Sequence, residues 1–112
     1  MNIIILQQYN LEMRKGRKKY AAYISGNSIS NYIFGYRHPD DVDDFISDIN
    51  LAINGNFQQI EDPEYSGGIG SHWYAWITPT HFELWQDGFP KTIMPLQDWK
   101  EILMSWEECL EI

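Results

Sequence analysis

Hydrophobic and polar positions follow two different periods along the chain, and each period predicts one type of element. The clearest helical pattern is central, where apolar residues recur at spacings of three and four: Val42, Phe45, Ile46, Ile49 and Ile53. This is the period of one buried stripe on an α-helix. Pro39 and the aspartates after it suit a helix start, and Asn54-Gly55-Asn56 suits a helix end. The pattern therefore predicts a central helix.

A second helical pattern occupies the last part of the chain, after Pro95. Its apolar residues also step by three and four, with Ile102 and Cys109 beside them: Leu96, Trp99, Leu103, Trp106 and Leu110. The remaining positions carry acids: Asp98, Glu101, Glu107, Glu108 and Glu111. One apolar and one acidic face predict an amphipathic C-terminal helix.

Segments rich in β-forming residues predict strands before and just after the central helix. Residues 2–9 predict a first strand. Residues 17–25 and 28–36 flank Gly26-Asn27, a dipeptide typical of two-residue hairpin turns. Residues 57–61 predict a further short strand. The sequence therefore predicts strands both before and after the central helix.

A second hairpin is predicted after residues 62–70, a glycine-rich segment that we expect to be a flexible loop. Residues 72–78 and 81–86 alternate in polarity around Pro79-Thr80, and residues 91–94 predict one more short strand. The alternation leaves the inner face of this hairpin open between two sets of residues. One set is Trp73, Ala75 and Ile77, and the other is Tyr74 and Trp76.

Strands grouped with one central and one C-terminal helix, without regular βαβ alternation, indicate an α+β fold. We expect one domain over residues 1–112, because a chain of this length can bury a core without disulfides or a structural metal. The expected architecture is an antiparallel sheet of about five or six strands with helices on one face.

Charge is distributed unevenly along the chain. It holds 8 Lys and Arg against 16 Asp and Glu, a net charge of −8. Six of the bases and a single acid fall in residues 1–37, whereas residues 38–112 hold the rest and are strongly anionic. An anionic surface repels nucleic acid and anionic lipid and speeds encounter with cationic macromolecules. The distribution predicts a basic protein partner and no direct contact with nucleic acid or a membrane.

The densest acidic cluster belongs to the predicted central helix: Asp40, Asp41, Asp43, Asp44 and Asp48. Like charges at these spacings destabilise an isolated helix by roughly a few tenths of a kcal/mol per pair. No Lys or Arg in the helix compensates them. We interpret the cluster as a docking surface for a cationic partner, and the alternative is a solvated helix face. A calcium loop is disfavoured, because the segment lacks the required glycine and terminal glutamate.

A second acidic cluster stands beside the glycine-rich segment, close in sequence to the aromatic hairpin. Tight interfaces combine rigid aromatic anchors with charges of the right sign, although most rings in a small protein fill its core. We predict that the partner-binding residues come from both clusters and the hairpin: Asp40, Asp41, Asp44, Asp48, Glu61, Asp62, Glu64, Tyr65, Tyr74 and Trp76.

The basic run from Arg14 to Lys19 admits several interpretations. It could contact nucleic acid or a membrane. Because the chain as a whole is anionic, we favour a solubilising loop or an internal partner for the acidic helices.

The sequence offers no catalytic constellation. His38, His72, His81 and Cys109 have no metal-ligand spacing, and no serine lies in a nucleophile elbow. We therefore expect no enzymatic activity, cofactor, metal or small-molecule substrate. The single cysteine fits a reducing compartment, and no stretch reads as a signal peptide or a membrane span, so we expect a cytoplasmic protein.

The last part of the chain carries a family resemblance. Phe82-Glu-Leu-Trp85 and the turn Asp87-Gly88 precede Thr92-Ile-Met-Pro-Leu96, which leads into the helix Gln97–Leu110. This succession resembles the C-terminal end of small bacterial immunity proteins, which guard cells against polymorphic toxins, including those of contact-dependent growth inhibition systems. In that family a strand, a proline-leucine-x-aspartate-aromatic helix start and an isoleucine-leucine-x-x-tryptophan helix close the domain.

The resemblance implies a non-catalytic inhibitor that binds the C-terminal toxin domain of a large secreted effector and blocks its active site. Many such toxins are nucleases, whose substrate groove must be positive to hold phosphates. We therefore expect a nuclease as the target, with a ribonuclease favoured. The alternatives are a phage-type acidic mimic of nucleic acid and another kind of acidic protein-interaction module.

Overall fold

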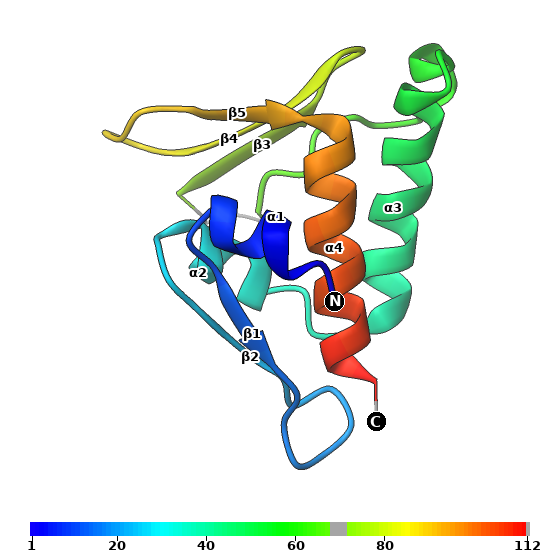
Figure 1. Cartoon of the computed structure of the whole chain (residues 1–112). Coiled ribbons are helices and arrows are strands. Elements are labelled where there is room, and N and C mark those ends of the chain that lie inside the picture. Colours follow the sequence, from blue (N-terminus) through cyan, green and yellow to red (C-terminus); the bar gives the residue numbers. More distant parts are fainter. Residues whose placement is uncertain (68–71, 112) are drawn as a thin grey trace. The chain divides into compact units, whose positions relative to one another are not determined.

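A computed structural model describes residues 1–67 and 72–111 and shows an α+β fold (Figure 1). The chain divides into two compact units. The terminal unit comprises Met1–Ile46 with Lys100–Ile112, and the central unit comprises Ser47–Trp99. A single domain over the whole chain stays a prediction.

Both predicted helices are confirmed. Helix α3 spans Pro39–Ile53 and helix α4 spans Leu96–Leu110. All five residues of the predicted stripe of α4 are buried, as are Ile102 and Cys109. In α3 three stripe residues are fully buried, whereas Ile53 at its end is 38% exposed. Gly55, with φ +79°, follows α3 as the C-terminal signal predicts.

The strand predicted over residues 2–9 is wrong, because helix α1 spans Ile3–Gln8. Asn2 caps this helix, since its side-chain oxygen accepts a hydrogen bond from the backbone N–H of Ile5 at 3.2 Å. Leu6 is buried. One cap and one buried contact override the β preference of the isoleucines.

The hairpin predicted around Gly26-Asn27 is also wrong. Strand β1, Glu12–Arg14, pairs antiparallel with strand β2, Tyr23–Ser25. The chain then enters helix α2, Ile29–Phe34. The Asn27 side chain accepts a hydrogen bond from the N–H of Ile29 at 2.9 Å, so this residue initiates a helical turn instead of a hairpin.

The terminal unit is held together by contacts to backbone carbonyls. The indole N–H of the fully buried Trp106 donates to the carbonyl of Tyr36 at 2.6 Å. The Arg37 guanidinium donates to the carbonyls of Ala22 at 3.0 Å and Tyr20 at 2.7 Å. Carbonyls that are partly shielded from water need such partners, so Trp106 and Arg37 fix the connections between elements of this unit.

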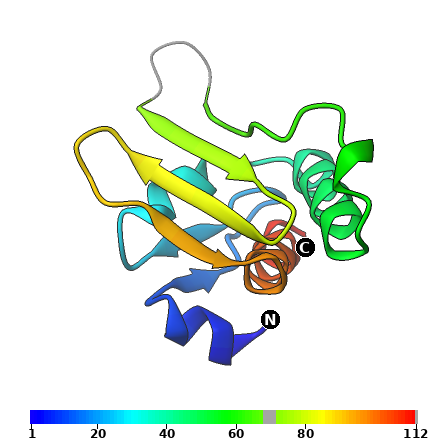
Figure 2. The same ribbon diagram turned by 90° about the horizontal axis from the view of Figure 1, so that it is seen from above.

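The central unit contains the predicted second hairpin. Strands β3, Trp73–Ile77, and β4, His81–Gln86, pair antiparallel, and β4 pairs with β5, Thr92–Pro95. Figure 2 shows β4 between β3 and β5. The inner face of the sheet is apolar and buried: Ala75, Ile77, Phe82, Leu84 and Met94. The structure thus selects the set with Ala75 and Ile77, although Trp73 is only half-buried.

Two further strand predictions differ from the structure. Residues 57–61 do not form a strand; Phe57–Gln59 is a short 3₁₀ helix, closed by a bond from the N–H of Ile60 to the carbonyl of Phe57 at 3.0 Å. The described residues form two antiparallel sheets of two and three strands, not one sheet of five or six. The five described strands are divided, because α2 and α3 separate β2 from β3 along the chain, and β1 and β2 pair with each other and not with β3–β5.

The first part of the predicted flexible loop is held against β3. The N–H of Tyr65 donates to the carbonyl of Ala75 at 2.8 Å, and the N–H of Ile77 donates to the carbonyl of Pro63 at 2.9 Å. Glu64 forms an antiparallel bridge with Trp76. Residues 68–70 of the predicted loop lie outside the described residues.

Candidate protein-binding site

Opposite the buried face of the central sheet lies a second face with aromatic and charged side chains. The register places Glu64 opposite Trp76, Trp76 opposite Glu83, and Glu83 opposite Ile93. Directly opposed residues project to the same side of a sheet, so these four form one row across it. We call this surface the outer face and define it by the row and its neighbours: Glu64, Tyr74, Trp76, His81, Glu83, Trp85, Lys91 and Ile93.

An aromatic stack lies next to this row. The rings of Tyr74 and Trp85 are opposed in the register and stacked, with centroids 5.2 Å apart and planes at 17°. The Lys91 ammonium lies 4.4 Å from the centroid of the Trp85 ring. Both rings are half-buried, so they are held in one orientation while part of each stays accessible. Rings fixed in this way lose little entropy when a partner covers them.

The Tyr74 hydroxyl donates to Asp87 Oδ2 at 3.3 Å. This hydrogen bond, with the negative charge of Asp87, raises the pKa of Tyr74 above its ordinary value. The phenol therefore remains a neutral donor at one end of the stack.

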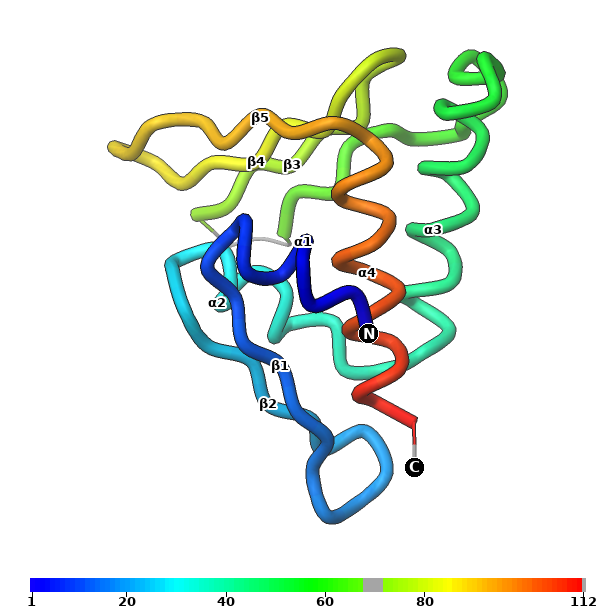
Figure 3. Tube along the Cα trace, in the orientation of Figure 1, coloured from blue at the N-terminus to red at the C-terminus, as the bar shows by residue number. Residues whose placement is uncertain are grey.

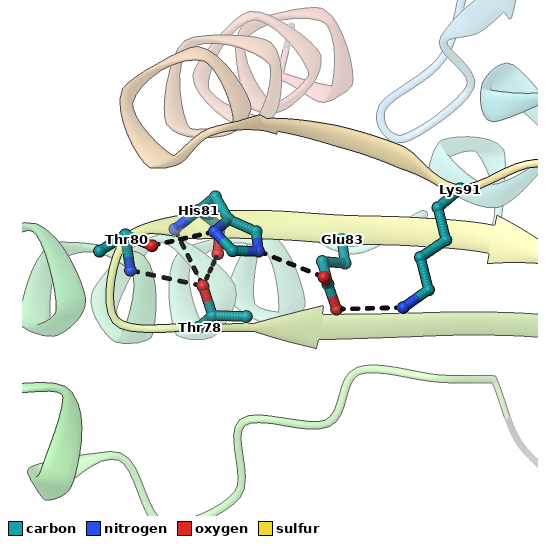
Figure 4. Close-up of polar contacts among 5 residues, drawn as sticks. All are labelled: Thr78, Thr80, His81, Glu83 and Lys91. Carbon is teal, nitrogen blue, oxygen red and sulfur yellow. Dashed lines mark hydrogen bonds and ion pairs between the residues drawn. The ribbon is translucent and has the colours of Figure 1, made fainter.

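The carboxylate of Glu83 is held between two cationic or ionisable groups (Figure 4). His81 Nε2 lies 3.2 Å from Glu83 Oε1, and Lys91 Nζ lies 3.8 Å from Glu83 Oε2. Only 21% of the Glu83 side chain is exposed, and its contacts with His81 and Lys91 restrict the orientation of the carboxylate. Glu83 thus presents a fixed negative charge near the centre of the outer face.

The His81 ring is itself positioned by the β3–β4 turn. Its Nδ1 lies 2.9 Å from Thr80 Oγ1, and the Thr78 hydroxyl donates to the His81 carbonyl at 2.8 Å (Figure 4). A hydroxyl, an imidazole and a carboxylate in this order also occur in nucleophilic triads. Here Thr80 is exposed at the tip of a tight turn, which gives a substrate no enclosing wall. We interpret the array as one that orients Glu83.

Three of the predicted partner-binding residues come together on the outer face. Tyr74 and Trp76 alternate along β3, and Glu64 is opposite Trp76. The exposed Asp62 caps the turn that presents Glu64, since its Oδ1 accepts from the Glu64 N–H at 3.0 Å. Glu61 precedes it and is also exposed.

Tyr65 and Asp48 are engaged with each other. The Tyr65 hydroxyl donates to Asp48 Oδ2, and both residues are half-buried. Tyr65 has the opposite parity to Glu64, so its ring leaves the outer face. This contact joins the 63–66 segment to the part of α3 in the central unit, so both residues help to hold that unit together.

The remaining predicted residues, Asp40, Asp41 and Asp44, belong to the terminal unit. All three are exposed on α3. Asp40 lies 3.7 Å from His38 Nδ1. In the described part of this unit, none of the three forms an ion pair with Lys or Arg. Their charge is therefore not neutralised by the basic run near the start of the chain.

A pair of carboxyl groups that the sequence did not reveal links α3 to α4 within the terminal unit. Burial, a hydrogen bond with Asp43, and the negative charges of Asp43 and Glu111 raise the pKa of Glu107 to about 7. Glu107 Oε2 is buried and accepts no hydrogen bond from the described residues. The charged form of Glu107 is thus poorly solvated, and its neutral form is favoured.

Four further residues of the outer face were not predicted as partner-binding: His81, Glu83, Lys91 and Ile93. Trp85 was considered only as a possible anchor. The alternation of side chains along the strands could have identified these residues. Once Ala75 and Ile77 are known to face the core, alternation places these side chains on the outer face of the sheet.

In the described part of the chain, no helix combines the length and apolar character needed to cross a membrane. The same residues contain no group of three or more His, Cys, Asp or Glu side chains arranged to hold a metal ion. Comparisons with protein-family models, with curated proteins and with solved structures find no match to this chain.

Proposed function

We propose that this chain is a cytoplasmic immunity protein that binds and neutralises the toxin domain of a large secreted effector. The single observation that carries the proposal is the outer face of the central sheet, where stacked aromatic rings adjoin a row that contains two carboxylates. The proposed target is a nuclease, with a ribonuclease favoured, and the proposed effect is blockage of its basic groove.

The outer face has the composition of a binding surface. Aromatic residues dominate interface energetics, and Trp76 and the Tyr74–Trp85 stack supply large rings that are only half-buried. Glu83 is fixed beside them and Glu64 is exposed at the sheet edge. A nuclease groove presents cations that bind phosphates, and these carboxylates complement such cations.

The exposed aspartates of α3 contribute at longer range. Asp40, Asp41 and Asp44 add to the net charge of −8 without pairing to Lys or Arg in the described terminal unit. Uncompensated charge steers a basic partner into encounter and raises the association rate. In this proposal the outer face supplies contact energy and the helix supplies attraction.

The gene of an immunity protein is expected directly downstream of the gene of its effector. The experiment therefore begins with the gene directly upstream of the one that encodes this chain. The C-terminal domain encoded there is purified, and its binding to this chain is measured at about 0.05 M and about 0.5 M salt, since added salt screens charge attraction. Trp76→Ala should weaken binding by about thirtyfold, the loss of about 2 kcal/mol typical of an interface anchor. Glu83→Gln should reduce the salt dependence of binding.

Matched controls come from the terminal unit. Phe34 is an aromatic residue that is 47% exposed, and Glu12 is an exposed carboxylate. Phe34→Ala and Glu12→Gln should leave affinity within about twofold of the original value, a change below 0.5 kcal/mol. Co-expression with the toxin should protect cells, and Trp76→Ala should abolish protection. Undiminished binding and protection by Trp76→Ala would show that the outer face is not the site.

A further inference from the structure

An open groove lies in the terminal unit between α1 and the β1–β2 ribbon, with a volume of about 600 Å³. Its lining includes the buried side chains of Leu6, Leu11 and Met13. Ile3 and Tyr23 also line it, and each is 54% exposed. This volume falls within the range of small-molecule sites, which are lined mainly by apolar side chains. The groove is therefore suited to hold an apolar chain.

A basic pocket of about 480 Å³ adjoins the groove. It is lined by Arg14, Lys15, Gly16, Arg17 and Tyr23, and it shares Arg14 and Tyr23 with the groove. The Arg14 guanidinium lies 5.3 Å from the centroid of the Tyr23 ring. Three cations thus meet at one end of an apolar groove.

The charges of this pocket are not used internally. In the described part of the chain, Arg14, Lys15 and Arg17 form no ion pair with a carboxylate. Lys15 is only a minor influence on the pKa values of Glu108 and Cys109; the pKa of Glu108 is lowered chiefly by its hydrogen bond with the Met1 ammonium, and burial raises that of Cys109. Although the chain has 16 acidic residues, these three cations have no carboxylate partner among the described residues. They are therefore available to bind an anion from outside the chain.

The loop that carries these cations has a fixed shape; Figure 3 shows its path between β1 and β2. A Cβ added to Gly16 would lie only 1.6 Å from the carbonyl oxygen of Ala21, so the two sides of the loop are in close approach. The Tyr20 N–H donates to the carbonyl of Leu110 at 2.9 Å, and the Tyr20 carbonyl accepts from Arg37 at 2.7 Å. A pocket shaped before ligand arrives loses less entropy on binding.

We infer that the terminal unit binds an anionic amphiphile, with its hydrocarbon chain in the groove and its carboxylate or phosphate head group at Arg14, Lys15 and Arg17. The register supports this polarity, because Glu12 pairs with Ser25 at the end of the ribbon away from the basic loop. Glu12 also lines the groove, so an anionic head group is repelled at that end. Nucleic acid would leave the apolar groove empty and would meet the repulsion of the whole chain.

The first experiment separates head group from chain. Calorimetry with the full chain uses dodecyl phosphate and dodecanoate below their micelle concentrations, a neutral dodecyl glycoside, and inorganic phosphate alone. Both anionic amphiphiles should bind with one-to-one stoichiometry. The neutral glycoside should bind at least about tenfold more weakly, and inorganic phosphate should bind at least about a hundredfold more weakly. Equal affinity for the neutral and anionic amphiphiles would overturn the head-group assignment.

The second experiment uses variants matched in charge and exposure. Lys15→Gln with Arg17→Gln should weaken dodecyl phosphate binding at least about tenfold, because two charge-assisted contacts are lost. Lys18→Gln with Lys19→Gln removes the same charge from the same loop, outside the pocket lining, and should change affinity less than about twofold. Equal losses in the two pairs would reveal unspecific attraction and overturn the proposal.

A third pair tests the chain-binding groove. Ile3→Ser should weaken binding, whereas Ile4→Ser should not, because Ile4 is 78% exposed on the same helix but does not line the groove. Binding only to anionic vesicles, with none to monomeric amphiphile, would also refute the site and assign the patch to a membrane surface. These outcomes are independent of the proposed toxin contact. That contact involves the central unit, and toxin binding by the Trp76→Ala variant tests it.

Discussion

Replacing Glu107 by glutamine should stabilise the terminal unit at alkaline pH and leave it unchanged in acid. The folded pKa of Glu107, about 7, is above the ordinary value of 4.5 because of burial and the neighbouring Asp43 and Glu111. Between these two values the folded chain retains a proton that the unfolded chain has released. The stability that Glu107 contributes is therefore fully present below pH 4.5 and is lost as pH rises through about 7.

The magnitude follows from the pKa difference. A change from 4.5 to about 7 corresponds to about 3.4 kcal/mol at 1.36 kcal/mol for each pH unit. Glu107 is half-buried and Asp43 is exposed, so solvent screens the interaction and about 1.5 kcal/mol is a better expectation. Glutamine keeps the shape of Glu107, cannot ionise, and supplies an N–H to the Asp43 carboxylate.

The assay is the free energy of local unfolding at about pH 4.5 and about pH 8, from hydrogen exchange of the α4 amides in residues 100–110. Glu107→Gln should exceed the original chain by about 1.5 kcal/mol at the higher pH and match it at the lower. Glu108→Gln is the opposite control. The pKa of Glu108 is lowered by the Met1 ammonium, so its contribution is present near neutrality and is lost in acid. A Glu107→Gln variant with the same stability as the original chain at both pH values would refute this reasoning.

Three other substitutions test contacts of the terminal unit. Trp106→Phe removes the donor to the Tyr36 carbonyl and opens a cavity, so urea unfolding should show a loss of about 3 kcal/mol. Arg37→Lys keeps the charge but cannot span both of its carbonyl acceptors, so a loss of about 1–2 kcal/mol is expected in the same measurement, and unchanged stability would refute the bidentate role. Gly16→Ala forces the basic loop open, because its Cβ has no room; amide chemical shifts should change around Tyr20, and unchanged shifts would contradict the close approach.

Long helices were predictable from the sequence and short ones were not. In α3 and α4 the apolar period persists for several turns, so the buried stripe outweighs the local preferences of single residues. Helices α1 and α2 have only six residues each, too few for a period to show. Their formation depends on the hydrogen bonds of Asn2 and Asn27. The isoleucines within both helices predict strands when only their intrinsic propensity is considered.

The candidate site was predictable only in part for a similar reason. Tyr74 and Trp76 are close in sequence and share a face by alternation. Glu83 and Ile93 join them only through the register, which depends on where each turn begins. The Asp48–Tyr65 contact joins two predicted partner-binding residues that are 17 positions apart and show no common pattern, so the sequence did not reveal that they contact each other.

One edge of the central sheet has a consequence for behaviour at high concentration. Segment 63–66 occupies the β3 edge, while no described strand pairs with the other edge, formed by β5. That strand has only four residues, ends at Pro95, and follows Pro90 and Lys91. Proline and lysine interrupt the stacking of identical strands that propagates amyloid. These residues thus disfavour growth of the central sheet by edge-to-edge pairing of β5 with another copy of the chain.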